Sequence, residues 1–363
     1  MRYPSTNSDW PPQIAQTPFC VTAVKFSHNI PSLLAVGTGQ NFGIAGKGCQ
    51  HVYSVSRNAE SPTLRASYLC DQTVLDCAWS EEISSVLGAA LGDGCVNLWD
   101  VRQEKLNPHQ FSPPLQILKG HSRECFSLEW NLHLPHLLLT ASWDLSVRLW
   151  DVPTGLELLC LPGVHQQAVY KAAWCPLQSS ILATCGGDGC MRILDVRENA
   201  GRTNPSSSSF LAKSLATQFA HEGEALAVDW NKFSPFVIAT SGTDNVIRLW
   251  DIRKLQASNK TSSTPFEGCL ESLRGHSLAV RCIQWSPIRE AVLASGSYDM
   301  TVGVWDCRRA ALQHRYSHHS EFVVGLDWNI FADGVLSSAS WDGSFGVWDC
   351  LRGSGPVQLK KKF

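Results

Sequence analysis

Short runs in which apolar and polar residues alternate recur along the whole chain, separated by turn residues. Residues 280–285 alternate in this way, as do residues 292–295 and 301–305. Alternation with a period of two predicts β-strands with one face more buried than the other. No segment shows a sustained helical period. The pattern therefore predicts an all-β protein built from repeated units of four short strands.

A fixed register of residue types marks each repeated unit. Trp-Asp pairs end the third strand at residues 99–100, 150–151, 250–251, 305–306 and 348–349. Leu194-Asp195 fills the remaining unit, so successive units lie 43–56 residues apart. An Asp lies six residues before each pair, and a Trp lies fourteen residues before that Asp. In five units a His lies nine residues before that Trp. A degenerate seventh copy opens the chain with Phe26 and Gln40 at the Trp and Asp positions. These residues resemble the WD-repeat family, and the resemblance implies a seven-bladed β-propeller.

The repeated His, Ser or Thr, Asp and Trp residues have a structural explanation. The resemblance implies that they form one hydrogen-bonded chain per blade, which satisfies buried polar groups. The sequence offers four complete sets: His121, Thr140, Asp144 and Trp150; His221, Thr240, Asp244 and Trp250; His276, Ser295, Asp299 and Trp305; His319, Ser338, Asp342 and Trp348. If the His and Asp residues of these sets were catalytic dyads, the same dyad would be repeated in several blades around the ring. Leu194 in the fourth blade, and Cys70 and Ala89 in the second, interrupt the chain, so we expect those blades to be looser.

The chain is expected to form one large domain with short ends. The domain is the propeller, residues 19–350. An N-terminal segment, residues 1–18, precedes it, and a C-terminal tail, residues 351–363, follows it. Either end could supply the strand that closes the ring, because residues 12–15 and residues 355–360 both have strand character. Two polar insertions, residues 199–209 and 256–264, fall between third and outer strands, so we expect them on the lower face of the propeller.

Composition narrows the class of protein. Apolar residues make up 44% of the chain, enough for a sizeable core. Thirty basic and 32 acidic residues give a net charge of −2, which argues against a nucleic-acid-binding protein. The 14 cysteines are scattered, with no C-x-x-C pair, so we expect buried free thiols in a reducing compartment and no metal site. We find no secretory signal and no apolar run long enough for a membrane span, and expect no direct insertion into a membrane.

The positions that the repeat leaves free to vary predict a binding surface. They lie three and five residues after each loop His, or just before the turn Asp, and all are expected on the upper rim. We predict a peptide-binding face made by Asp71, Glu124, Phe126, Trp143, Tyr170, Glu224, Leu226, Tyr298, Glu321, Phe322 and Trp341. An aromatic surface with interspersed carboxylates is typical of a partner site, here for an amphipathic helix that carries Arg or Lys. Alternatively, some of these rings pack on one another around the channel mouth.

Residues outside the repeat register carry a more specific resemblance. The runs 40–48 in the first blade and 318–327 in the seventh are the distinctive part, supported by residues 296–302 and 141–144. Together they resemble the receptors for the type-2 peroxisomal targeting signal. The resemblance implies a receptor that binds this N-terminal, basic and amphipathic helical signal of folded matrix enzymes in the cytosol. It also implies a co-receptor that covers the helix and docking proteins at the peroxisomal membrane. Our first candidates for the carboxylates that bind the basic residue are Glu124 and Glu224.

Two other classes of function remain to be weighed. A general WD-repeat scaffold, such as a chromatin-binding or ubiquitin-ligase subunit, has the same fold and could bind a histone tail on an acidic, aromatic face. An enzyme is the weaker alternative. The chain has no Gly-rich phosphate loop, no cluster of metal ligands and no G-x-S-x-G elbow. We therefore expect no cofactor and no catalytic residues.

Overall fold

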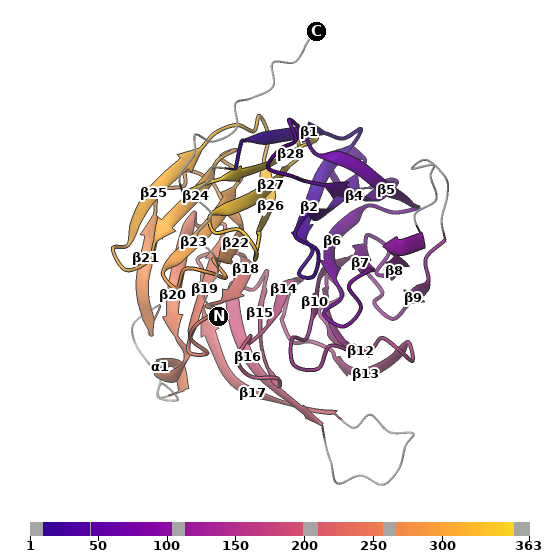
Figure 1. Ribbon diagram of the computed structural model, residues 1–363. Coiled ribbons are helices and arrows are strands. Elements are labelled where there is room, and N and C mark those ends of the chain that lie inside the picture. Colours follow the sequence, from indigo (N-terminus) through magenta and orange to yellow (C-terminus); the bar gives the residue numbers. More distant parts are fainter. Residues whose placement is uncertain are drawn as a thin grey trace.

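The structure, a computed structural model, describes residues 10–43, 45–103, 113–198, 210–256, 266 and 268–351. Within these residues, 28 strands form seven four-stranded sheets. The sheets stand as blades around a central axis (Figure 1). The predicted fold, a seven-bladed WD-repeat propeller, is confirmed.

Each blade is an antiparallel meander that runs from the channel to the rim. Blade 1 holds β2 (Cys20–Phe26), β3 (Leu33–Gly39), β4 (Gly48–Ser54) and β5 (Thr63–Cys70). Blade 2 holds β6 (Val74–Trp79), β7 (Val86–Leu91), β8 (Val96–Asp100) and β9 (Gln116–Leu118). Blade 3 holds β10 (Cys125–Trp130), β11 (Leu137–Ser142), β12 (Val147–Asp151) and β13 (Leu156–Leu161). Blade 4 holds β14 (Val169–Trp174), β15 (Ile181–Gly186), β16 (Cys190–Glu198) and β17 (Phe210–Phe219).

The last three blades follow the same plan. Blade 5 holds β18 (Ala225–Trp230), β19 (Val237–Gly242), β20 (Val246–Asp251) and β21 (Cys269–Arg274). Blade 6 holds β22 (Val280–Trp285), β23 (Val292–Ser297), β24 (Val302–Asp306) and β25 (Ala311–Tyr316). Blade 7 holds β26 (Val323–Trp328), β27 (Val335–Ser340) and β28 (Ser344–Asp349), and its outer strand is β1 (Gln13–Gln16).

The N-terminal strand closes the ring. β1 pairs antiparallel with β28, with Gln13 opposite Val347 and Gln16 opposite Ser344. The two strands lie side by side at the top of Figure 1, although they come from opposite ends of the chain. The buried Gln13 side chain also donates to the carbonyls of Ser56 and Ala59 in blade 1, at 2.6 Å each. The second candidate for the closing strand, residues 355–360, lies outside the described residues.

Short helices occur only in connections of the described chain. They are η1 (Asn41–Gly43), η2 (Val101–Gln103) and α1 (Ile252–Gln256). Helix α1 was not expected, because five residues are too few to show a helical period. Its Ile252 and Leu255 pack into the core between blades 4 and 5. The polar insertions, residues 199–209 and 256–264, lie outside the described residues apart from Gln256, the last residue of α1. No helix in the described part is long and apolar enough to cross a membrane.

Apolar cores fill the contacts between neighbouring blades. Seven clusters of buried side chains occur, and each combines residues from two adjacent blades. The cluster between blades 7 and 1 includes Trp10, Phe26 and Phe345, so the ring closure is packed as well as hydrogen-bonded. Burial between blades explains why a single blade cannot fold alone. All 14 cysteines are free, and six of them are buried.

The predicted polar chains are present, with one correction. In blade 5, Thr240 Oγ1 lies 2.8 Å from His221 Nε2 and accepts from Trp250 Nε1 at 2.8 Å, while His221 Nδ1 lies 2.9 Å from Asp244. Blades 3 and 6 have the same arrangement. In blade 7, His319, Ser338 and Asp342 are linked as expected. However, the indole nitrogen of Trp348 has no hydrogen-bond partner among the described residues.

A second histidine explains the difference in blade 7. His318 Nε2 lies 3.0 Å from Ser338 Oγ, on the hydroxyl that accepts the indole N–H in other blades. Its ring also meets Trp348 edge-on at 4.8 Å. Blade 2, which lacks both His and hydroxyl, likewise leaves Trp99 Nε1 buried without a partner.

Candidate functional site

A ring of β-bulges builds the upper mouth of the channel. In every blade, the pairing of the inner strand with the second strand skips one residue near the upper end. The skipped residues are Thr22, Leu75, Phe126, Tyr170, Leu226, Arg281 and Val324. A bulge redirects the side chain of the unpaired residue. All of these residues except Leu226 line the channel, so the strand register itself places variable side chains around the opening.

Blades 3 and 4 supply the first aromatic cluster, which consists of Phe126, Trp143 and Tyr170. Phe126 stacks on Trp143, with ring centroids 5.1 Å apart, and both rings meet Tyr170 edge-on at 5.6 and 6.0 Å. The backbone N–H of Trp143 donates to the carbonyl of Glu124 at 3.1 Å, which fixes the turn beside the inner strand. The three rings are half-buried. They offer an apolar surface that is rigid before any ligand binds.

Blades 6, 7 and 1 supply the second aromatic cluster, which consists of Phe42, Tyr298, Phe322 and Trp341. Tyr298 stacks on Phe322 at 4.5 Å, and Trp341 lies 5.3 Å from Phe322. Phe42 extends the cluster from the first-blade insertion and lies 5.9 Å from Trp341. Its side chain is 51% exposed and its φ is 58°, a left-handed conformation that is uncommon for an aromatic residue. Such strain is concentrated at functional sites.

Arg281 lies between the two aromatic clusters. From blade 6 its guanidinium reaches the ring of Phe126 in blade 3, 5.0 Å from the centroid, and donates to the carbonyl of Leu226 at 3.4 Å. Burial raises the pKa of both Tyr170 and Tyr298, and the charge of Arg281 opposes the rise in each case. Arg281 therefore places a positive charge at the centre of the mouth, between the two aromatic clusters.

Glu224 is the carboxylate most closely joined to the aromatic surface. It accepts a hydrogen bond from Tyr170 Oη at 3.0 Å. Burial raises the pKa of Tyr170, and the negative charge of Glu224 raises it further. No basic side chain among the described residues forms an ion pair with Glu224 or with Glu321, and both are half-buried. These two acids can accept a basic group from a partner.

The other two predicted acids already have basic neighbours. Arg123 Nε lies 3.4 Å from Glu124, and the same guanidinium lies 5.6 Å from the centroid of Trp143. Lys47 lies 3.8 Å from Asp71, and both are well exposed. Of the two carboxylates that we first considered for binding the basic residue of the ligand, Glu224 is therefore the better candidate and Glu124 the weaker one. Exposed ion pairs of this kind are weak, so either acid remains able to exchange partners.

Leu226 requires a correction. Its side chain is only 3% exposed, so it packs beneath the surface and offers its backbone carbonyl to Arg281. Sequence reasoning also missed Phe42 and Arg281 as site residues. The unusual first-blade insertion was the signal for Phe42. Arg281 occupies one of the variable rim positions and is the one basic residue among them. No group of three or more potential metal ligands occurs in the described residues.

The repeat register and the seven sheets define a WD-repeat propeller, whose upper mouth carries variable side chains. The family model for the WD domain, G-beta repeat, matches residues 112–151, 212–251, 267–306 and 310–349. The Saccharomyces cerevisiae peroxisomal targeting signal 2 receptor is 30% identical over 83% of this chain and 89% of its own length. The human receptor of the same name is 31% identical over 84% of each chain. The chain belongs to the family of peroxisomal targeting signal 2 receptors. By contrast, a histone acetyltransferase type B subunit 2 from Debaryomyces hansenii is 28% identical over 61% of this chain and 49% of its own.

Proposed function

We propose that the protein is a cytosolic import receptor that binds a type-2 peroxisomal targeting signal on its upper face. The signal would lie across the channel mouth as an amphipathic helix. Its apolar side would pack on the two aromatic clusters, and its basic residue would reach a carboxylate. With a co-receptor and docking proteins, the receptor would deliver its cargo enzymes to the peroxisomal membrane. This proposal includes no enzymatic activity.

The arrangement of Glu224 beside the first aromatic cluster carries the proposal. A helix needs an apolar surface for one stripe of side chains and a charged partner at the edge of that stripe. Glu224 joins the two, because Tyr170 holds the carboxylate against the rings at 3.0 Å. A hydrogen bond between charged groups contributes about 1.5–3 kcal/mol. The positive charge of Arg281 at the centre disfavours a basic residue there, so the helix is oriented with its basic end over Glu224 or Glu321.

A binding measurement on paired variants tests this assignment. A fluorescent nonapeptide with a basic residue and an apolar stripe should gain anisotropy on mixing with the receptor. Glu224→Lys should weaken binding about tenfold or more, since it removes the attraction and adds repulsion. The matched control is Glu222→Lys, which makes the same charge change at an exposed position of the same loop. Equal losses in both variants would show only a change in overall charge and would remove Glu224 from the site.

The scaffold alternative predicts a different preference. A chromatin subunit should bind an extended lysine-rich peptide without an apolar stripe at least as tightly as the amphipathic nonapeptide. The aromatic clusters favour the helical ligand, because an extended polar tail would leave most of their apolar surface uncovered. Comparison of the two peptides on the same protein separates the two functions.

A further inference from the structure

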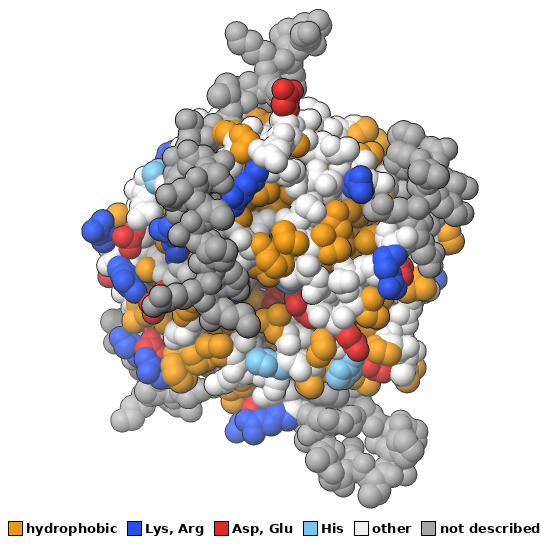
Figure 2. All heavy atoms as spheres, viewed as in Figure 1, with side chains coloured by type: hydrophobic (Ala, Val, Ile, Leu, Met, Phe, Trp, Pro, Cys, Tyr) orange, Lys and Arg blue, Asp and Glu red, His pale blue; other side chains and the backbone are white. Residues whose placement is uncertain are grey.

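A cavity of about 530 Å³ occupies the central channel. Its lower half is lined by the inner strands and by the loops that follow them, which contribute His28, Glu81, Leu132, Lys232 and Pro287. The inner-strand tryptophans Trp79, Trp130, Trp174, Trp285 and Trp328 are also among the residues at its wall, although their side chains are packed in the cores between blades. Figure 2 shows hydrophobic side chains gathered around the centre of the ring, with acidic ones among them. The volume is in the range of small-molecule sites.

Three ion pairs with a common orientation lie in this cavity. Lys25 lies 3.2 Å from Asp327, Lys171 lies 3.0 Å from Asp76, and Lys232 lies 2.7 Å from Asp229. In each pair the lysine is the more exposed partner. The side-chain exposures are 21% against 3%, 25% against 13% and 27% against 13%. All six residues line the cavity, and the lysine side chains are the more accessible partners.

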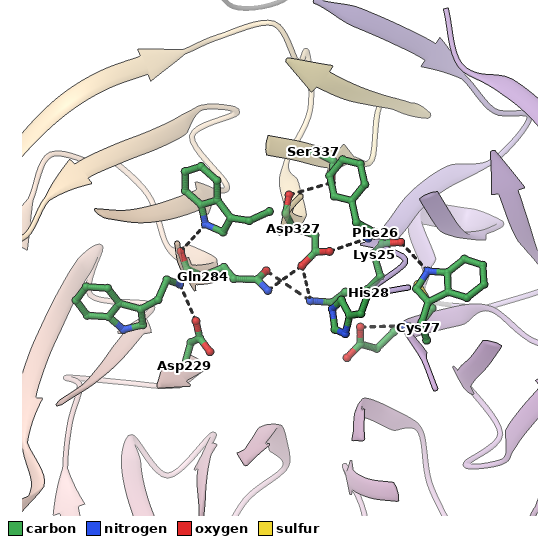
Figure 3. A network of polar contacts seen from close by, with 12 residues as sticks. Lys25, Phe26, His28, Cys77, Asp229, Gln284, Asp327 and Ser337 are labelled. Carbon is green, nitrogen blue, oxygen red and sulfur yellow. Dashed lines mark hydrogen bonds and ion pairs between the residues drawn. The ribbon is translucent and has the colours of Figure 1, made fainter. Parts of the chain in front are cut away.

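Backbone N–H groups hold the carboxylates in that position. Asp327 accepts from Phe26 N at 2.7 Å, and Asp229 accepts from Trp285 N at 2.7 Å. Asp76 accepts from its neighbour Cys77 N at 2.9 Å. Figure 3 shows Asp327 between Lys25 and the backbone of Phe26, and Asp229 turned toward a neighbouring strand. These acids are occupied by the protein itself and are not free to meet a ligand.

The lysines, in contrast, keep unused donors. An ammonium group has three N–H bonds. Lys171 and Lys232 each have one carboxylate as their polar partner among the described residues, while Lys25 has Asp327 and, at 3.5 Å, the side-chain oxygen of Gln284. At least two donors on each of Lys171 and Lys232 are left for another acceptor in the cavity.

The three ammonium groups act on one common region. Burial raises the pKa of the Glu129 carboxyl, and the charges of Lys171, Lys232 and Lys25 all oppose that rise. Yet Glu129 forms no ion pair with any of them, and it accepts from Trp174 N at 3.2 Å. The three lysines therefore line one cavity, and Glu129 lies near them without pairing with any of them.

We propose that the channel cavity binds a small organic anion with an apolar body, held by Lys25, Lys171 and Lys232. The oxyanion, a carboxylate or a phosphate, takes the unused ammonium donors, and apolar residues of the lining, such as Leu132 and Pro287, contact the apolar body. The cavity continues into the upper mouth, where Phe126, Tyr170 and Arg281 also line it. The proposed lysine contacts are distinct from the residues assigned to the signal, and the anion site does not depend on the proposed receptor function.

A fluorescent anion provides the direct test. 8-Anilinonaphthalene-1-sulfonate carries one sulfonate on an apolar body and becomes fluorescent when it leaves water. We expect saturable binding, and we expect the uncharged N-phenyl-1-naphthylamine to bind at least about tenfold more weakly. Octanoate and octyl phosphate should displace the sulfonate, whereas octanol should not. The relative potency of the two anions shows whether the site prefers carboxylate or phosphate.

Paired variants locate the site. Lys171→Gln and Lys232→Gln should each weaken sulfonate binding about tenfold. Lys119→Gln, at an exposed position of blade 2, and Trp341→Ala, on the upper face, should leave the affinity within about twofold. Thermal unfolding of each variant verifies the fold, and Lys232→Arg, which keeps the charge, should retain binding.

Three results would overturn the proposal: no saturable fluorescence, equal affinity for the uncharged dye, or binding unchanged in both lysine variants. Binding that is lost in Trp341→Ala instead would assign the dye to the upper face and would also overturn it. The affinity of Lys171→Gln and Lys232→Gln for the signal nonapeptide should stay unchanged. Failure of this site is thus distinguishable from failure of the receptor function.

Discussion

The carboxylate of Asp327 in the last blade accepts a hydrogen bond from the backbone N–H of Phe26 in the first blade, at 2.7 Å. The same carboxylate pairs with Lys25 at 3.2 Å and accepts from the side-chain amide of Gln284 at 2.8 Å. It therefore connects blades 6, 7 and 1 on the channel side, opposite the strand pairing of β1 and β28 at the rim. The ring is closed at both its inner and its outer edge.

Asp327→Ala should destabilise the protein by about 3–5 kcal/mol, because it leaves the half-buried Lys25 without its partner and the buried Phe26 N without its acceptor. Burial alone would lower the pKa of Lys25, but Asp327 and then Asp76 outweigh it and hold that pKa above its ordinary value. Denaturant unfolding measures the loss. Asp333→Ala is the control, since its pair with Arg289 is partly exposed and should contribute less than about 1 kcal/mol.

Thr240→Val should cost about 2–4 kcal/mol. The change keeps the shape of the side chain but removes the hydroxyl that serves both His221 and Trp250, so two buried polar atoms lose a partner. Thr154→Val, in an exposed turn of blade 3, should change stability by less than about 0.5 kcal/mol. Equal effects of the two substitutions would mean that the polar chain does not stabilise the blade.

Stability should fall as the pH is lowered from about 7 to 5. Burial lowers the pKa of His51 to about 4 and lowers that of His221 despite its bond to Asp244. Between the folded pKa and the ordinary value of about 6.5, only the unfolded chain binds the proton, so acid favours unfolding. Each such histidine contributes about 1.4 kcal/mol per pH unit in that window.

Replacement of His51 tests this slope. His51→Asn should make the dependence of the unfolding free energy on pH shallower by about 1.4 kcal/mol per unit between pH 6 and 5. Below about pH 4 a second loss should follow, because hydrogen bonds from His121 and Ser146 outweigh burial and hold the pKa of Asp144 well below its usual range.

Phe42→Asn should separate binding from stability. Asn tolerates the left-handed backbone that Phe42 adopts, so the unfolding free energy should stay the same or rise. The lost ring should weaken the signal nonapeptide about 5- to 30-fold, as for an aromatic anchor in an interface. Leu156→Asn, an exposed apolar residue on outer strand β13, should leave binding unaltered. Unchanged affinity in Phe42→Asn would remove the insertion from the site.

The sequence predicted the blade plan because each blade repeats the same register of His, Trp and Asp. It also predicted the aromatic rim, because the variable rim positions lie at fixed offsets from the loop His or the turn Asp of each unit. It could not show that Glu124 faces Arg123 while Glu224 faces Tyr170, because both contacts depend on side-chain directions. Contacts across the channel, such as Arg281 on Phe126, join blades that are far apart in sequence and have no local signal. The position of His318 on Ser338 was also hidden, because the register assigns only His319 to the polar chain and says nothing of its neighbour.

The most direct test of the central claim is a charge exchange between the receptor and its ligand. Glu224→Lys with the natural nonapeptide, and the natural receptor with a nonapeptide whose basic residue is replaced by Glu, should each bind at least about tenfold more weakly. If Glu224 contacts that residue, the two changes combined should restore affinity to within about threefold of the starting pair. The account would be contradicted if the losses from Glu224→Lys and from the altered nonapeptide simply multiplied when the two changes are combined, while Glu321→Lys restored binding of the altered nonapeptide.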